Sequence, residues 1–337
     1  MLKTISTILL SLIVLHGYSQ SAYEYFSSIN EPFEPINKDT WNYIKQVSRG
    51  NNARRIDKKR IELINTLNKA KYEVSQVGAF EGETALRDET RDYLNILLLT
   101  LKSDYEKIID LEQVAEESYD AMEAYILTKE RVSIKTEAAF NSLRARQSQF
   151  AQVHNIKLIE NDSRLSKKLD NAGEVINYYN KVYLLFYKSY WYETKMLTAL
   201  EENNVGDMEQ FRQTLASISK SDMDSLNNLN SFYRDKSLKE ACHQLLYFYH
   251  GEAVRYSPDQ VDFLIKQKKM TDLKGKIESK PKNKLTQQEI DEYNLAINEY
   301  NEAVKKFNET SNYLSKFRTQ GLENWNKTVE DFYNNFL

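Results

Sequence analysis

Two stretches of the chain, residues 51–94 and 203–246, align without a gap at an offset of 152 positions. Only seven of the 44 aligned positions are identical, but they fall at matching structural places: a helix start, a corner between helices and a core position. A repeat of this length predicts two similar structural units before any local pattern is considered. The identical pairs are Asn51/Asn203, Asn52/Asn204, Arg60/Arg212, Leu63/Leu215, Phe80/Phe232, Leu86/Leu238 and Leu94/Leu246.

The chain lacks the residues that would interrupt long helices. None of its four prolines lies within residues 36–257, and it has only nine glycines. No strand-like alternation of apolar and polar residues bounded by turns appears. The sequence therefore predicts an all-α fold, built from two tandem, divergently duplicated antiparallel helical-bundle units with a long C-terminal helix.

Capping residues locate several helix starts, because a side-chain oxygen can accept a hydrogen bond from the first helical turn. Asn52 and Asn204 are expected to begin equivalent helices, and Thr286 to begin the last one. The expected divisions are a signal peptide at 1–19, an extended N-terminal segment at 20–36, a first helical unit at 37–160, a second at 161–337 and, inside it, a Lys-rich linker at 266–284.

The last helix, expected at 286–336, carries the clearest heptad-like pattern. Its apolar residues recur in steps of three and four, as in a helix that packs along its length against other helices. At 1.5 Å per residue such a helix is roughly 75 Å long. Elongation of the molecule, or self-association through this helix, is therefore a candidate property.

The N-terminus has the features of an export signal. Lys3 precedes a short apolar run, and small residues at Gly17 and Ser19 predict cleavage before Gln20. The apolar run is too short to span a bilayer. The expected location is the periplasm, the cell surface or the medium, with no membrane-spanning segment.

Charge and cysteine content exclude other classes of protein. Cys242 is the only cysteine, so that no intrachain disulfide can form. The net charge is −3, and basic residues interleaved with aromatic ones are not found. No nucleic-acid partner is expected.

One helix face has the residues of a metal site. Glu240 and His243 form a Glu-x-x-His pattern, and His250 follows two turns later. Di-iron bundles use two such motifs with two further glutamates. Here only one motif exists, and the aligned positions of the first stretch do not repeat it. A metal carrier is therefore an alternative rather than the main hypothesis.

An aromatic segment is the most unusual part of the composition. Its rings can form a core, or they can line a ligand cleft, and both alternatives stay open at the level of sequence. The residues are Tyr178, Tyr179, Tyr183, Phe186, Tyr187, Tyr190 and Trp191.

The start of the first repeated helix is basic, with Arg54, Arg55, Lys58 and Lys59, whereas the aligned start of the second is acidic. Opposite charges at equivalent places could orient two units or two molecules, although exposed ion pairs add little stability. A polyanion site is the alternative.

Three stretches resemble a family of exported, all-helical surface or periplasmic proteins of uncharacterised activity from Bacteroidetes-like bacteria and leptospires. They are Asn51–Ile64 (NNARRIDKKRIELI), Ser118–Tyr125 (SYDAMEAY) and Val175–Tyr190 (VINYYNKVYLLFYKSY). The resemblance implies export and an address at the surface or in the periplasm. It assigns no substrate and no functional residues.

The sequence contains no Gly-x-Ser-x-Gly elbow, no glycine-rich phosphate loop and no His-Glu-x-x-His motif. We therefore expect a non-enzymatic protein, without cofactor or resident metal, that binds a partner protein or a surface component. The alternative is a periplasmic carrier that uses the aromatic helix 178–191 or the Glu240/His243/His250 face.

Overall fold

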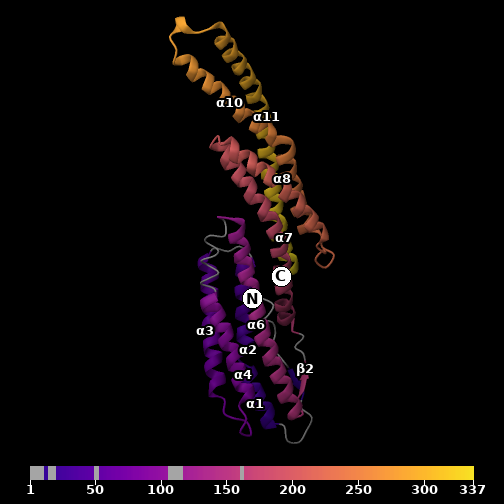
Figure 1. Cartoon of the computed structure of the whole chain (residues 1–337). Helices are drawn as coiled ribbons and strands as arrows, with labels where there is room; N and C mark the ends of the chain where they lie inside the picture. Colours follow the sequence, from indigo (N-terminus) through magenta and orange to yellow (C-terminus); the bar gives the residue numbers. More distant parts are fainter. Residues whose placement is uncertain (1–10, 14–19, 49–52, 105–116, 160–162) are drawn as a thin grey trace. The chain divides into compact units, whose positions relative to one another are not determined.

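The structure is a computed structural model that describes residues 11–13, 20–48, 53–104, 117–159 and 163–337 (Figure 1). The expectation of an all-α fold is confirmed. The α-helices are α1 (Gln20–Asn30), α2 (Phe33–Ser48), α3 (Ala53–Gln76), α4 (Ala85–Leu99), α6 (Tyr119–Val153), α7 (Arg164–Glu201), α8 (Val205–Asn228), α9 (Ser237–Gly251), α10 (Ser257–Glu278) and α11 (Gln287–Phe336).

Shorter elements complete the described chain. A π-helical turn, η1 (Thr100–Asp104), continues α4, and a second, η2 (Glu252–Tyr256), joins α9 to α10. Strands β1 (Ser11–Ile13) and β2 (Lys157–Ile159) pair antiparallel, with Leu12 opposite Leu158. The strand β1 lies inside the segment expected to be a signal peptide.

The bounds of three pairs of elements agree with the alignment of the sequence. Helix α8 begins and ends 152 positions after α3, α9 does so after α4, and η2 after η1. That the two stretches descend from one duplicated bundle unit stays a prediction, but their local structures correspond element by element.

The corners between the paired helices also correspond. Phe80 and Glu83 exchange backbone hydrogen bonds of 3.0 and 2.9 Å, and Phe232 forms the equivalent bridge with Asp235. Positive φ angles occur at both central residues of each corner: 52° and 83° in the first, 44° and 74° in the second. Gly82 occupies the left-handed second position of the first corner, but Arg234 occupies it in the second.

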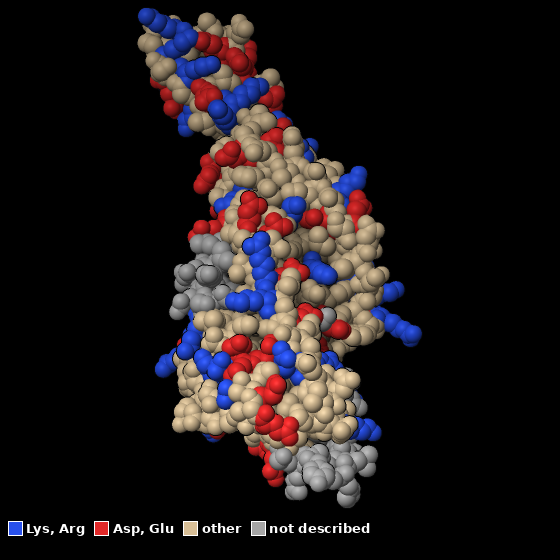
Figure 2. Space-filling view, turned by 60° about the horizontal axis from the view of Figure 1, so that its bottom comes forward, with Lys and Arg blue, Asp and Glu red and all other residues tan. Residues whose placement is uncertain are grey.

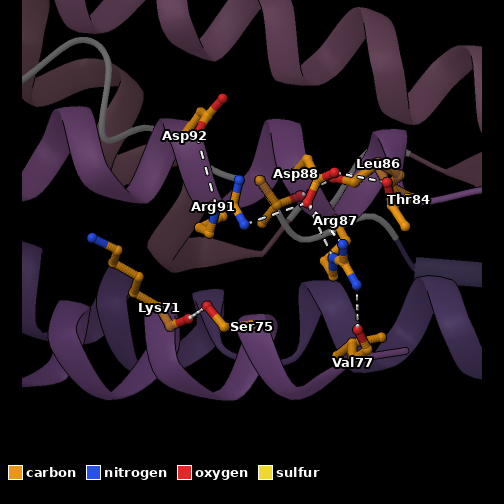
Figure 3. Close-up of polar contacts among 10 residues, drawn as sticks. Lys71, Ser75, Val77, Thr84, Leu86, Arg87, Asp88, Arg91 and Asp92 are labelled. Carbon is orange, nitrogen blue, oxygen red and sulfur yellow. Dashed lines mark hydrogen bonds and ion pairs between the residues drawn. The ribbon is translucent and has the colours of Figure 1, made fainter. Parts of the chain in front are cut away.

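A basic side chain closes each corner onto the preceding helix. Arg87 donates to the carbonyl of Val77 over 3.1 Å (Figure 3), and Lys239 donates to the carbonyl of Leu229 at the same offset. In the first corner Asp88 accepts hydrogen bonds from Thr84 and Arg87, which hold the pKa of its carboxyl below the usual value. The donor is an arginine in the first corner and a lysine in the second, so that a count of identical residues does not detect this equivalence.

An arginine binds each π-helical turn. A π-turn shifts the backbone hydrogen bonds by one residue, so that a carbonyl needs another donor. Arg60 of α3 donates to Leu101 O over 3.2 Å, and Arg212 of α8 donates to Ala253 O over 2.8 Å. Each guanidinium also binds an acid one turn earlier on its own helix, Asp57 or Glu209. The arginine that is identical in both aligned stretches thus links the first helix of each pair to the π-helical turn that follows the second.

The chain divides into two compact units, Met1–Asn180 with Glu330–Leu337, and Lys181–Val329. The boundaries lie inside α7 and α11 rather than between residues 160 and 161, because both long helices contribute to both units. Unit 1 packs α1, α2, α3, α4 and α6 around one apolar core. None of the described helices combines the length and the continuous apolar run that a bilayer crossing requires.

The segment 20–36, expected to be extended, is mostly helical. Tyr25, Phe26 and Ile29 of α1 lie on one buried face, and Tyr25 contacts Phe80 and Phe150 with ring centroids 5.3 and 5.4 Å apart. Pro32 and Pro35 fall in the turn before α2 and in its first turn, where a missing N–H costs nothing.

The expected Lys-rich linker at 266–284 is helical as far as Glu278 and belongs to α10. Only the short connection after it, with a 3₁₀ turn at Lys282–Lys284, leads to α11. The capping predictions were confirmed for Asn204, which accepts from Asp207 N, and for Thr286, which exchanges hydrogen bonds with Glu289. Asn52 lies outside the described residues.

The different residues of the two corners allow a matched stability test. Replacing Gly82 with alanine should lower the free energy of unfolding by about 1 kcal/mol, because φ is +83° there. Arg234→Gly should raise it by about 0.5 kcal/mol, since it relieves a left-handed arginine. Gly78→Ala is the control, with open space around the added methyl group. Equal losses for both alanine variants in urea unfolding would contradict the assignment.

Candidate functional site

The Glu240/His243/His250 face does not form a metal centre. The Nδ1 atom of His250 lies 3.0 Å from the carbonyl oxygen of Ala216, so that this nitrogen serves contact with α8. Glu240 is exposed, and its aligned residue in the first corner is Asp88. Within the part of the chain that the structure describes, no group of three or more His, Cys, Asp or Glu residues could hold a metal ion.

The aromatic segment of α7 contributes to two different cores. In unit 1, Tyr178 lies 5.9 Å from Phe332, and Tyr179 lies 5.2 Å from Tyr333, measured between ring centroids. Burial raises the pKa of Tyr333 well above its usual value. These contacts favour the core interpretation for the first turn of the segment.

In unit 2 the same segment is also largely internal. Phe186 and Tyr187 are buried, and Phe186 stacks on Trp325 of α11 at 4.7 Å. Tyr183 and Tyr190 are half-buried, and each stacks on one of the two buried rings. Trp191 is half-buried and Lys195 lies 5.2 Å from its ring. The rings of this helix mostly contact one another and α11.

The basic start of α3 is a solvated surface for the most part. Arg54, Arg55 and Lys58 are exposed, whereas Lys59 forms a 2.5 Å ion pair with Glu62. Arg60, the residue beside them, binds the π-turn of unit 1. No ligand-binding arrangement of these four predicted residues emerges from the described contacts.

The Lys-rich segment and the start of α11 form an antiparallel helical hairpin within unit 2. Phe263 stacks on Tyr300 and Phe307 at 5.8 and 4.3 Å, and Lys269 pairs with Glu299 at 2.8 Å. The apolar pattern of α11 is therefore used inside the chain. Figure 2 shows lysines and acids interspersed at the upper end of the view, where this hairpin lies. Residues 257–310 contain ten Lys and ten Asp or Glu, so that the hairpin has no net charge.

Sequence reasoning missed a charged network in the interior of unit 2. Arg318 of α11 binds Glu193 of α7 through Nε and Glu252 of η2 through Nη2, the second contact being 2.6 Å long. The two glutamates are 1% and 0% exposed. The three residues are 125 and 66 positions apart, so that no local pattern could have brought them together.

Burial raises the pKa of both glutamates, while the Arg318 guanidinium opposes that shift. The pKa of Glu252 is raised well above its usual value, first by burial and then by the nearby Glu193 carboxyl. The network joins η2, α7 and α11, and the two glutamates are its buried members.

The elements that this network joins also carry an exposed aromatic patch. We define the η2/α11 patch as Tyr247, Arg255, Tyr256, Tyr313 and Phe317. Three of its rings are unusually exposed, Tyr247 to 56% and Tyr313 and Phe317 each to 41%. The patch residues come from the end of α9, from η2 and from α11, the elements that Glu252 and Arg318 join.

The members of the η2/α11 patch contact one another. The Arg255 Nη2 atom lies 3.2 Å from the Tyr247 hydroxyl, and its Cζ atom lies 5.6 Å from the ring. The Tyr313 ring lies 4.8 Å from Tyr256 and 4.4 Å from Phe317. Proximity of Tyr256 raises the pKa of Tyr313. Exposed apolar rings that gather around an arginine have the composition of binding hot spots.

The patch residues of α9 and η2 are not repeated in unit 1. At the same offset of 152 positions, just beyond the aligned stretches, Asn95 holds the position of Tyr247 and Thr100 that of Glu252. The spacing of Tyr313 and Phe317 on one helix face was visible in the sequence. Their meeting with η2 depends on a π-turn and on contacts between distant segments, which the sequence did not reveal.

Comparisons with family models, with curated proteins and with solved structures found no match for this chain.

A second buried acid gives unit 2 a testable pH dependence. Asp222 is 4% exposed, beside the Ser189 hydroxyl, and burial raises the pKa of its carboxyl to about 6 although Lys188 opposes the shift. A raised pKa favours the neutral acid in the folded state, so that this stabilisation is present below about pH 4 and is lost as the pH rises through 6.

We therefore expect Asp222→Asn to be more stable than the wild-type chain by about 1 kcal/mol at pH 7.5, and equally stable at pH 4. Chemical unfolding at both pH values measures this. Asp224→Asn, on the exposed face of the same helix, is the control and should change neither value by more than about 0.5 kcal/mol. A loss of stability in Asp222→Asn at pH 7.5 would contradict the assignment.

Proposed function

We propose that this chain is an exported, non-enzymatic helical protein that binds a partner protein or a surface component through the η2/α11 patch. The observation that carries this proposal is the exposure of Tyr247, which contacts Arg255, and of Tyr313 and Phe317, which contact each other. Single exposed rings are common on protein surfaces, but contiguous ones mark binding sites more often.

The rigidity of the support favours binding. The two elements that carry most of the patch residues, η2 and α11, are joined by the ion pair between Glu252 and Arg318. A surface whose side chains are held in place before association loses less conformational entropy when a partner binds. A preorganised set of tyrosines and an arginine therefore fits recognition of another molecule better than it fits a solvated surface.

Export rests on the N-terminal signal pattern and on the resemblance to exported helical proteins. The mature chain would begin at Gln20 and would act in the periplasm, at the cell surface or in the medium. Removal of residues 1–19 would leave β2 without the strand β1.

A ligand or metal carrier is the less well supported alternative. Phe186 and Tyr187 are buried among other rings, and His250 contacts α8. Self-association through the helix 286–336 also stays a prediction, and the packing of Phe307 on Phe263 gives that helix a partner within its own chain.

Photo-crosslinking in the producing cell tests the proposal. A benzophenone amino acid at position 313 or 317 should yield covalent adducts, because these side chains would face the partner. The same substitution at Tyr72 is the control, since that tyrosine is 67% exposed on α3 of unit 1. Mass spectrometry of the adducts identifies the partner and reports the N-terminus of the chain, for which Gln20 is expected. Adducts equally abundant at Tyr72, or absent at 313 and 317, would refute the proposal.

A further inference from the structure

The η2/α11 patch gathers hydrogen-bond donors around one point of the surface. The guanidinium of Arg255 carries five N–H donors, and a hydrogen bond to Tyr247 uses only one of its nitrogens. The hydroxyls of Tyr247, Tyr256 and Tyr313 lie close enough to Arg255 to influence its pKa, which they raise. Arginine and phenol hydroxyls together form a donor set suited to a carboxylate.

Arg255 also differs from the other arginines of its region. Arg212 binds Glu209, and Arg318 binds two glutamates. Among the described contacts, Arg255 has no carboxylate within 4 Å, and its side chain instead lies along its own helix, 3.4 Å from the position of a Cβ atom at Gly251. Glu252, three positions before Arg255, binds Arg318 instead. The patch thus presents one uncompensated positive charge.

The rest of the patch is apolar in character. Tyr313 and Phe317 are one helical turn apart on α11 and are both 41% exposed. None of the five patch residues carries a carboxylate or an amide, the groups that usually bind the hydroxyls of a sugar. A single arginine is also too little charge to hold an anionic lipid surface. These properties suit an extended peptide better than a glycan or a membrane.

We propose that the η2/α11 patch binds an acidic segment of a partner protein, in which a carboxylate binds Arg255 and a neighbouring apolar side chain lies on Tyr313 and Phe317. This inference rests on the proposed function and specifies the chemistry of its partner. The charge-assisted bond fixes the register of the segment, and the rings provide the apolar contact area.

Binding of defined peptides by the full chain tests the proposal. The probes are fluorescein-labelled dodecapeptides of alternating glutamate with leucine or phenylalanine, and the same peptides with glutamine in place of glutamate. Fluorescence anisotropy should give a Kd for the acidic peptides that is lower by about tenfold or more. Arg255→Gln should abolish this difference, and Phe317→Ser should weaken the binding of both peptides.

Lys327→Gln on α11 is the matched control, because it removes the same charge from an exposed position outside the patch. It should leave the Kd unchanged. Thermal melting checks the fold of all variants, and the exposed positions of Arg255 and Phe317 should leave it unaffected.

Each other outcome has a distinct meaning. Equal affinity for acidic and neutral peptides, or an unchanged Kd in Arg255→Gln, would overturn the acidic-peptide inference while leaving the patch as a binding site. Binding of a uronic-acid oligosaccharide in place of the peptides, with loss in Phe317→Ser, would overturn it in favour of a glycan. Absence of peptide binding together with absence of crosslinks at 313 and 317 would remove the proposed function as well.

Discussion

The contact on which unit 2 depends is the double ion pair of Arg318. Its guanidinium lies between two glutamates that water does not reach, and this arrangement is stable only while all three residues are present. Removal of the arginine would leave two buried carboxyls with no positive partner. Because Glu252 belongs to η2 and Arg318 to α11, the network decides where these two elements lie relative to each other. The exposed rings on η2 and α11 are therefore positioned by the same contacts.

The close packing of α9 and α11 supports the same arrangement. A Cβ atom at Gly321 would lie 2.8 Å from the Cδ2 atom of Leu245, so that a larger residue at this position would require the leucine side chain to move. Asn324 and Gln244 form a hydrogen bond of 3.3 Å nearby. The apolar contact and the ion network act on the same pair of segments. Together they make the η2/α11 patch a fixed surface.

Much of the scaffold could be predicted from the sequence. The absence of prolines between residues 36 and 257 indicated long helices, and the alignment at an offset of 152 located matching elements. Seven identities understated the correspondence, since Arg87 and Lys239 perform the same contact with different side chains. Helix α1 was missed, although its buried face, with Tyr25, Phe26 and Ile29, follows helical spacing.

The candidate site was beyond local patterns for a physical reason. Glu252 has an ionisable side chain, yet it is buried, because Arg318, 66 positions away, binds its carboxyl group. The π-turn that positions Arg255 beside Tyr247 has no capping or turn residue to indicate it, because η2 continues α9 without a break. By contrast, the aromatic segment of α7 stood out in composition and is mainly core. The aromatic composition of α7 thus marked a segment that packs mainly in the core. The exposed η2/α11 patch, by contrast, forms from residues that are far apart in the sequence.

Hydrogen exchange in an Arg318→Met variant tests most directly whether the buried network holds the patch in place. We expect the amides of residues 252–256 and 313–318 to exchange at least about tenfold faster than in the wild-type chain, because local opening no longer requires the ion pairs to break. Amides of α3 and α4 in unit 1 should keep their rates. Unchanged exchange in 252–256 and 313–318 would show that the patch is positioned without Arg318 and would contradict the central claim.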